Sequence, residues 1–277
     1  MKYGIVLLAL FALLISACYA GKLRKYPIIL FLKVIKTKDK KLRLKYVFYS
    51  FLASEYQICK RDNPNYSECM KNAIQDALTR LDNGIPTLNV PPLQPLNIPS
   101  ITIGEGKGAV NVVQKYKNFN LYDVGKSIIE KIEAKATPND LKLEVELLSP
   151  ETRFEADYSF NGRVLLLPIV GDGKCTVTLQ QVKITINLYA ETFEKKEKKY
   201  LKVKNVTLKL VPGKVIYNFE NLFNGDERLG NEMNRLLNDN WKDVYDDIGD
   251  QYAVALQTVF ADYADKVFSK VPFEEIS

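Results

Sequence analysis

The side chains that most often do chemistry in enzymes are scarce in this sequence, and one type is missing. None of the 277 residues is histidine. The Ser-His-Asp triad, the Cys-His dyad and histidine metal sites all need an imidazole, so the sequence excludes them. The Gly-x-Ser-x-Gly segment of many esterases is absent as well. We therefore expect a protein that is not an enzyme and that has no metal site and no cofactor.

Two glycine-containing segments resemble phosphate-binding loops but lack the required context. Gly125-Lys126-Ser127 ends like a P-loop, yet Asn120 stands where that motif has its first glycine. The segment Gly104-Glu105-Gly106-Lys107-Gly108 is not followed directly by a helical pattern. A hairpin turn is the better interpretation of the second segment, and neither one predicts a nucleotide site.

The N-terminus has the pattern of a secretory signal peptide. Met1-Lys2 is followed by an apolar run over residues 5–15 and then by small residues that end at Ala20. The run is short for a bilayer span, so we expect residues 1–20 to be removed, the protein to be secreted, and no stable membrane insertion afterwards. An alternative is a bacterial lipoprotein acylation site, which Ile15-Ser16-Ala17-Cys18 resembles.

Secretion would place the three remaining cysteines in an oxidising compartment. Cys59 and Cys69 flank the turn-rich segment Asp62-Asn63-Pro64-Asn65, and we expect them to form a disulfide around it. Cys175 is then the odd one, and a strand cysteine with no histidine beside it is predicted to be a buried small hydrophobe. The sequence also has two candidate N-glycosylation sites, Asn65 and Asn205.

The formal charge of +6 hides a division of the chain. Residues 21–51 carry ten Lys and Arg against one Asp, whereas residues 52–277 carry 28 basic and 32 acidic side chains. The basic residues are interleaved with Ile, Leu, Phe, Val and Tyr without a sustained amphipathic face, so we expect no nucleic-acid binding. Our hypothesis is that residues 21–51 are a translated retained intron, because AT-rich noncoding DNA would encode this composition. A disordered segment is the alternative.

From about residue 98 the chain alternates as β-strands do. The clearest case is Leu141 to Leu147, in which every second residue is apolar and the others are mostly charged. Asn161-Gly162 predicts a hairpin turn. A later long strand changes the parity of its apolar residues at Gln180-Gln181, which predicts a β-bulge and a bend.

The last sixth of the chain has the period of one long amphipathic helix, running from about Glu232 to Ser269 with a kink expected at Gly249. Long bent strands and one such helix can close a curved sheet around the helix. We therefore predict an α+β fold: a long curved antiparallel sheet wrapped around a long C-terminal helix, enclosing an elongated apolar channel. The residues expected to contact a ligand there are Phe154, Tyr158, Phe160, Leu166, Phe219, Trp241, Tyr245, Ile248 and Tyr252.

Several short motifs occur in one order between about residues 55 and 275. They are Cys59-Lys60-Arg61-Asp62 with Cys69, Gly84-Ile85-Pro86, Pro92-Leu93-Gln94-Pro95-Leu96, Tyr158 and Gly162, Leu166-Leu167-Pro168-Ile169-Val170-Gly171-Asp172-Gly173, Asn221-Leu222-Phe223-Asn224-Gly225-Asp226, Leu229-Gly230, and Leu237-Asn238-Asp239-Asn240-Trp241. With these motifs the sequence resembles the takeout and juvenile hormone-binding protein family of insects.

The resemblance implies a single wrap domain over residues 52–277 that encloses a lipid tunnel. It identifies Cys59 and Cys69 with the N-terminal disulfide of the family and argues against the bacterial lipoprotein. Hormone-binding members have a second disulfide; Cys175 stands in the place of one partner, but no later cysteine exists, which favours the takeout branch. The family is expected to lack a counterpart to residues 21–51.

The function that follows is a secreted, monomeric, non-enzymatic carrier of a small hydrophobic ligand, such as a juvenile hormone-like terpenoid, a fatty acid or a similar lipid. The alternative is a membrane- or partner-binding lipid-recognition module without ligand transport, which would use the basic segment. Apolar lining specifies shape and length rather than chemistry, so the sequence indicates a class of ligand and no single compound.

Overall fold

The computed structural model describes residues 32–36, 42–46 and 57–275. The chain divides into two compact units, residues 1–55 and 56–277. In the first unit, strands β1 (Leu32–Lys36) and β2 (Leu42–Tyr46) pair antiparallel, so part of the basic segment forms a two-stranded sheet. The predicted signal peptide, residues 1–20, lies outside the described residues.

The second unit is built on one antiparallel sheet of eight strands. The main path runs β10-β8-β7-β5-β3, while β4 and β6 also pair with β7 and β9 pairs with β8. The strands are β3 (Leu96–Ile103), β4 (Val110–Val112), β5 (Gln114–Tyr122), β6 (Ile128–Ala136), β7 (Asp140–Val164), β8 (Leu167–Lys195), β9 (Lys198–Val211) and β10 (Lys214–Phe219).

Strands β7 and β8 form one long hairpin whose turn lies at Leu165 and Leu166. Both leucines have positive φ, 49° and 69°, which a tight hairpin turn requires. The predicted turn at Asn161-Gly162 is wrong, because both residues are paired inside the hairpin. The glycine meets a packing demand instead: a Cβ on Gly162 would lie 2.4 Å from the carbonyl oxygen of Asn111 in β4.

The long hairpin bends near its middle. In β8 the buried positions are odd-numbered up to Leu179 and even-numbered from Val182. Gln181 lies between them with a φ of 50°, at the point where the outer partner of β8 changes from β10 to β9. The irregularity predicted at Gln180-Gln181 is therefore confirmed, and β7 follows the bend because its pairing with β8 continues across it.

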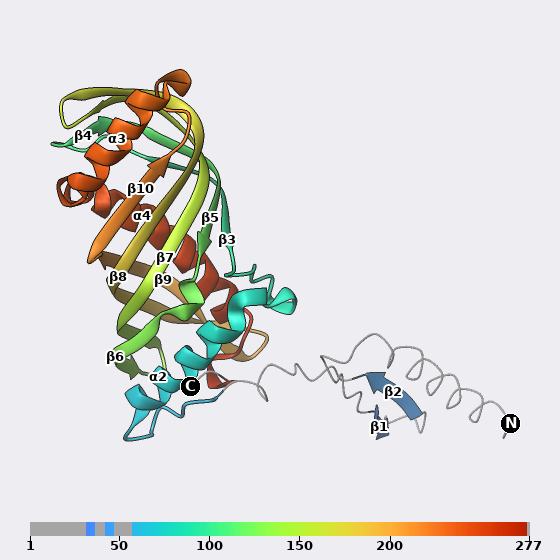
Figure 1. The fold of residues 1–277 in the computed structure, drawn as a ribbon. Coiled ribbons are helices and arrows are strands. Elements are labelled where there is room, and N and C mark those ends of the chain that lie inside the picture. Colours follow the sequence, from blue (N-terminus) through green and yellow to red (C-terminus); the bar gives the residue numbers. More distant parts are fainter. Residues whose placement is uncertain (1–31, 37–41, 47–56, 276–277) are drawn as a thin grey trace, which may run out of the picture. The chain divides into compact units, whose positions relative to one another are not determined.

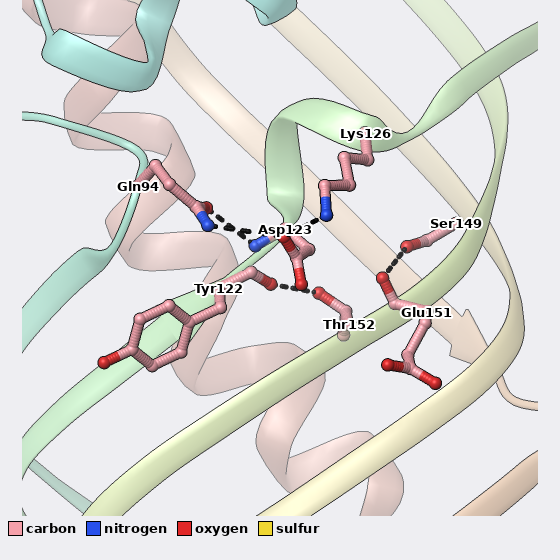
Figure 2. Close-up of polar contacts among 7 residues, drawn as sticks. All are labelled: Gln94, Tyr122, Asp123, Lys126, Ser149, Glu151 and Thr152. Carbon is pink, nitrogen blue, oxygen red and sulfur yellow. Dashed lines mark hydrogen bonds and ion pairs between the residues drawn. The ribbon is translucent and has the colours of Figure 1, made fainter.

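A polar cluster holds the turn after β5 against the bend in β7 (Figure 2). Asp123 has a φ of 67°, and its N–H donates to Oε1 of Gln94 at 2.8 Å. Its carboxylate accepts a bond from Nε2 of Gln94 at 3.3 Å and pairs with Nζ of Lys126 at 2.9 Å. From the neighbouring strand β7, Oγ1 of Thr152 donates to the carbonyl of Tyr122 at 2.9 Å. These bonds fix the turn beside the bend.

The C-terminal helix predicted as one element is two helices. The helical conformation is interrupted at Asn240, whose φ of −111° and ψ of 26° are not helical. The side-chain amide of Asn240 donates to the carbonyl of Leu236 at 2.9 Å. The kink predicted at Gly249 is wrong, because that glycine lies inside a regular helix. The helices are α2 (Tyr66–Arg80), α3 (Glu227–Asp239) and α4 (Trp241–Phe268), with 3₁₀ turns η2 (Leu81–Asn83), η3 (Pro86–Leu88), η4 (Val124–Lys126), η5 (Phe223–Gly225) and η6 (Phe273–Glu275).

Helix α4 lies in the concave side of the sheet. It contacts β9 and β10 and also β3 at the opposite edge, so the sheet curves around it. Figure 1 shows α4, in red, running along the long strands, and α2, in cyan, beside β6. The buried apolar residues form a larger cluster that includes α4 and a smaller one that includes α2. The predicted α+β fold, a curved antiparallel sheet wrapped around the C-terminal helix, is confirmed.

The glycine-rich loop between β3 and β4 closes on a carboxylate from α4. The backbone N–H groups of Lys107 and Gly108 each donate to Oδ1 of Asp247 at 2.9 Å, and that of Val110 donates to Oδ2 at 2.7 Å. A Cβ on Gly106 would lie 2.0 Å from the same carboxylate. The three backbone bonds outweigh the cost of burial and lower the pKa of Asp247. The loop therefore anchors the sheet to the helix.

Candidate functional site

An apolar cavity of about 160 Å³ lies between the curved sheet and α4. Strands β5 and β7 to β10 form most of its wall, α4 closes it, and Leu78 of α2 contributes from one side. An apolar cavity of about 150 Å³ is large enough to hold a benzene ring. The cavity therefore matches a ring or a short branched chain, and a longer ligand requires side chains to move. The elongated channel stays a prediction.

Hydrocarbon surface dominates the lining of this cavity. Of its 21 lining residues, sixteen have side chains without a polar atom, and none is charged. The other five carry a hydroxyl group: Ser127, Thr152, Tyr217, Tyr245 and Tyr252. Such a site can hold an apolar molecule and orient it by a small number of hydrogen bonds.

Tyr252 belongs to a buried polar cluster with Tyr116 and Gln114. The hydroxyls of Tyr116 and Tyr252 donate to Oε1 of Gln114 at 2.9 and 2.7 Å, and the two hydroxyl oxygens are 2.7 Å apart. Nε2 of Gln114 is buried and has no hydrogen-bond partner among the described residues. Burial raises the pKa of both tyrosines well above its usual value, so both hydroxyls stay protonated.

Tyr217 and Tyr245 bring two more hydroxyls to the cavity, from β10 and α4. That of Tyr245 donates to the carbonyl of Leu210 at 3.2 Å. That of Tyr217 belongs to a residue that is 93% buried. Burial raises the pKa of both, and the neighbouring Tyr245 hydroxyl contributes to the shift at Tyr217. Both groups are therefore neutral hydrogen-bond donors at neutral pH.

The structure brings three of the nine predicted ligand-contact residues to this cavity: Phe154, Tyr245 and Tyr252. Tyr158, Phe160 and Phe219 form a neighbouring aromatic cluster with ring centroids 4.6 to 5.1 Å apart, and the Tyr158 hydroxyl donates to the carbonyl of Glu220 at 2.5 Å. Ile248 is buried in the core, and Trp241 packs under Nζ of Lys214, 5.4 Å from its ring centroid. Ligand contact by these residues stays a prediction.

Leu166, one of the residues expected to contact a ligand, does not line the cavity, because it is 89% exposed. Its place in the turn between β7 and β8 explains the difference, because the turn projects the side chain beyond the end of both strands.

Several lining residues are not among those predicted from the sequence. Tyr217 of β10 and Phe119 of β5 both line the cavity. Each belongs to an alternating strand pattern that marks its side chain as buried, so the sequence holds a signal for burial. The sequence holds no signal for which buried side chains line the cavity, because that depends on how β5 and β10 pack against α4.

The cysteine and sequon predictions have different outcomes. Cys59 and Cys69 form the expected disulfide. Cys175 is free and buried, and burial raises the pKa of its thiol to about 12, which fits a small hydrophobe. Asn65 and Asn205 are both exposed, and their glycosylation stays a prediction.

No group of three or more Cys, Asp or Glu side chains is placed to hold a metal ion within residues 57–275. Among the helices described, none is long and apolar enough to cross a bilayer.

A sheet curved around a helix, with an apolar cavity between them, is an arrangement suited to binding small apolar molecules. The sequence profile described as haemolymph juvenile hormone binding protein matches residues 42–277. The chain therefore belongs to this family, whose members are secreted proteins that bind hydrophobic ligands. The match begins inside the basic segment, so residues 42–51 have a counterpart in the family.

Three similar proteins share about a quarter of their residues with this chain. The circadian clock-controlled protein daywake of Drosophila melanogaster is 25% identical over 224 residues, which cover 78% of this chain and 85% of that protein. Daywake of Drosophila yakuba is 23% identical over 223 residues, with the same coverage. The crystal structure of takeout 1 from Epiphyas postvittana matches with a TM-score of 0.69 and 24% identity, covering 79% of this chain and 98% of that one. The structural match supports the fold.

Proposed function

We propose that this protein is a secreted, non-enzymatic carrier that holds a small hydrophobic ligand in the cavity between the sheet and α4. The observation that carries the proposal is the cavity itself, whose 21 lining residues include no charged side chain. An unfilled apolar cavity lowers the stability of a folded protein. Binding of an apolar ligand would give this cavity a use that offsets that cost. Membership of a family of hydrophobic-ligand binders supports the same function.

Secretion, the monomeric state and the lack of catalysis are part of this proposal. The signal-peptide pattern of residues 1–20 and the Cys59–Cys69 disulfide support export. The absence of histidine removes the commonest general base, and the raised pKa of Cys175 makes its thiol a poor nucleophile at neutral pH.

The first test is native mass spectrometry of the secreted protein, followed by extraction and identification of any molecule that copurifies. We expect a bound apolar compound, or uptake of one from a panel of terpenoids, fatty acids, esters and fluorescent lipid probes. A protein that is reproducibly empty and takes up none of these would overturn the proposal.

A pair of neighbouring substitutions in β10 tests whether the cavity is the site. Val215 lines the cavity and is 1% exposed, whereas Ile216 faces away and is 40% exposed. Val215→Phe fills the space and should abolish uptake of the probe, while Ile216→Phe should leave uptake unchanged. Both variants are compared by thermal melting, so that a loss of uptake in a folded Val215→Phe protein is assigned to the cavity.

The alternative function, a membrane- or partner-binding module, is tested separately through the basic segment. Deleting residues 21–51 and measuring association with anionic liposomes distinguishes the two. Unchanged association with the liposomes removes that alternative.

The hypothesis of a retained intron is checked by sequencing the transcript across the junction between Ala20 and about Ala53.

A further inference from the structure

The turn that joins β7 to β8 contains residues that a tight hairpin turn normally avoids. Its two central residues, Leu165 and Leu166, both have positive φ. Turns of this kind favour Asn-Gly or Asp-Gly, because the left-handed conformation costs free energy for a residue with a large side chain. Two leucines stand here instead, so each needs a contact that offsets this cost.

Only the first leucine finds such a contact within the described fold. The side chain of Leu165 is partly buried against the larger apolar cluster, and its N–H donates to the carbonyl of Ala109 at 2.7 Å. Leu166 is 89% exposed. A single exposed leucine is ordinary on a protein surface. A leucine that is both exposed and strained breaks a local rule without a gain for the fold, which is typical of a residue with a role outside it.

Other exposed apolar side chains lie beside Leu166. Leu167 is 48% exposed and Val170 is 39% exposed, and Pro168 between them is exposed as well. We call Leu166, Leu167, Pro168 and Val170 the apolar tip. It lies at the end of the hairpin that runs beside β4 (Figure 1). Because the turn carries Leu166 beyond the paired strands, the tip projects, and a projecting apolar group suits a surface that it can penetrate.

Two cationic side chains flank the apolar tip. Arg163 of β7 is exposed and lies opposite Pro168 in the hairpin. Lys107 is exposed in the loop that the bond between Leu165 and Ala109 holds against the turn, and Glu105 is the acidic residue of that loop. Long basic side chains can reach phosphate groups while neighbouring apolar ones enter the boundary between headgroups and acyl chains. The arrangement therefore complements the phosphates of a phospholipid surface.

We infer that the apolar tip inserts into the surface of a phospholipid membrane, with Leu166 deepest and with Arg163 and Lys107 at the level of the phosphates. One fully exposed leucine and two half-exposed side chains offer less apolar surface than stable anchoring needs, so the contact is weak and reversible. The inference rests on neither the cavity nor the basic segment, and it adds a membrane-contacting surface to the proposed function.

Leu166→Asn in the full-length secreted protein tests the inference on vesicles of phosphatidylcholine, which carry no net charge to attract the basic segment. Asparagine tolerates the left-handed conformation, so the variant should melt at the same temperature as the wild type or higher. Its partition coefficient onto the vesicles should fall roughly tenfold, because the transfer of a leucine side chain out of water is lost.

Val211→Asn is the matched control. Val211 is 48% exposed at the end of β9, where it pairs with Lys183, far along β8 from the turn. Its replacement removes an exposed apolar side chain of similar size and should leave the partition coefficient unchanged. Cosedimentation over a series of vesicle concentrations measures the coefficient for all three proteins.

Three results would overturn the inference. The first is a wild type that does not associate with the vesicles, including one that instead self-associates through Leu166. The second is a partition coefficient that Leu166→Asn leaves unchanged or that Val211→Asn lowers equally. The third is a lower melting temperature of Leu166→Asn, which would show that the leucine serves the fold. The carrier function would stand in each case, because the uptake of apolar probes tests it separately.

Discussion

Asp247 shows how one side chain can join two distant parts of the chain. It lies on α4, yet its carboxylate accepts three backbone hydrogen bonds from the loop between β3 and β4. The loop has glycines at 104, 106 and 108, and a side chain at residue 106 would collide with the carboxylate. This glycine-containing loop therefore binds an anion, but the anion is the carboxylate of Asp247 and not the phosphate of a nucleotide.

We expect Asp247→Asn to destabilise the protein by roughly 2 kcal/mol at neutral pH, because an amide replaces a charged acceptor. Since the pKa of Asp247 is lowered by folding, its contribution is fully present above the ordinary aspartate value of about 3.9. The contribution is lost as pH falls through the lower, folded-state pKa. Urea unfolding of the variant and the wild type between neutral and acidic pH measures the difference.

Asp246→Asn is the matched control for this prediction, because Asp246 is exposed on the same helix and pairs with Lys242 one turn away. Its effect should stay within a few tenths of 1 kcal/mol, as for exposed helix pairs. Equal effects of the two substitutions would contradict the assigned role of Asp247.

Cys175 should behave as an inert thiol in the folded protein. It is 2% exposed, and burial raises its pKa to about 12. At pH 8 only about one thiol in ten thousand would then be ionised, and the thiolate is the reactive form. We expect a disulfide reagent such as Ellman's reagent to leave native protein unmodified and to modify one thiol after unfolding in guanidinium. Rapid reaction of the native protein would show that the site opens.

At the scale of elements, α3 covers the outer edge of β10 with side-chain amides. Asn238 accepts from the N–H of Tyr217 and donates to its carbonyl, both at 2.8 Å. Asn234 makes the same pair of bonds with Phe219, both at 2.9 Å. Four helix residues rise about 6 Å and two strand residues about 6.8 Å, so the spacings match. The edge of β10 is thereby closed to other strands.

Asn238→Ala should cost about 1–3 kcal/mol, because it leaves the backbone of Tyr217 without partners at a partly buried edge. Asn187→Ala is the comparison, since that side chain bonds only Oγ1 of Thr207 on the exposed face and should cost far less. Chemical denaturation measures both. A small, equal cost for the two would mean that water replaces the amide bonds of α3 without penalty.

At the scale of the whole molecule, the disulfide fastens the segment before α2 to the domain. Cys59 and Cys69 are separated by 10 residues and are both buried in the smaller apolar cluster. A loop of that length is worth about 3 kcal/mol by chain-entropy arguments. We expect the double variant Cys59→Ser/Cys69→Ser to lose about that much stability in thermal melting. Wild type measured in reducing agent should converge on the variant, and a persistent gap would show that the lost packing matters more.

Much of the fold could be predicted from the sequence, because an apolar period reports which side of an element is buried. The alternation in β7, the parity change at Gln181 and the helical period of α4 are properties of neighbouring residues. The predictions were wrong where one local sequence pattern is compatible with two different structures. Gly162 accommodates a neighbouring strand and not a turn, and Asn240 interrupts the helix in place of Gly249.

The sequence by itself determined the family, most of the elements, the Cys59–Cys69 pair and the lack of histidine chemistry, because each depends on residue type or local order. Only the tertiary structure decided which buried faces enclose a cavity. Tyr217 and Leu166 both lie in apolar stretches of the sequence. In the structure Tyr217 lines the cavity, whereas Leu166 is exposed in a turn. The reason is that a cavity is space left between elements far apart in sequence, and no local pattern records how closely they pack.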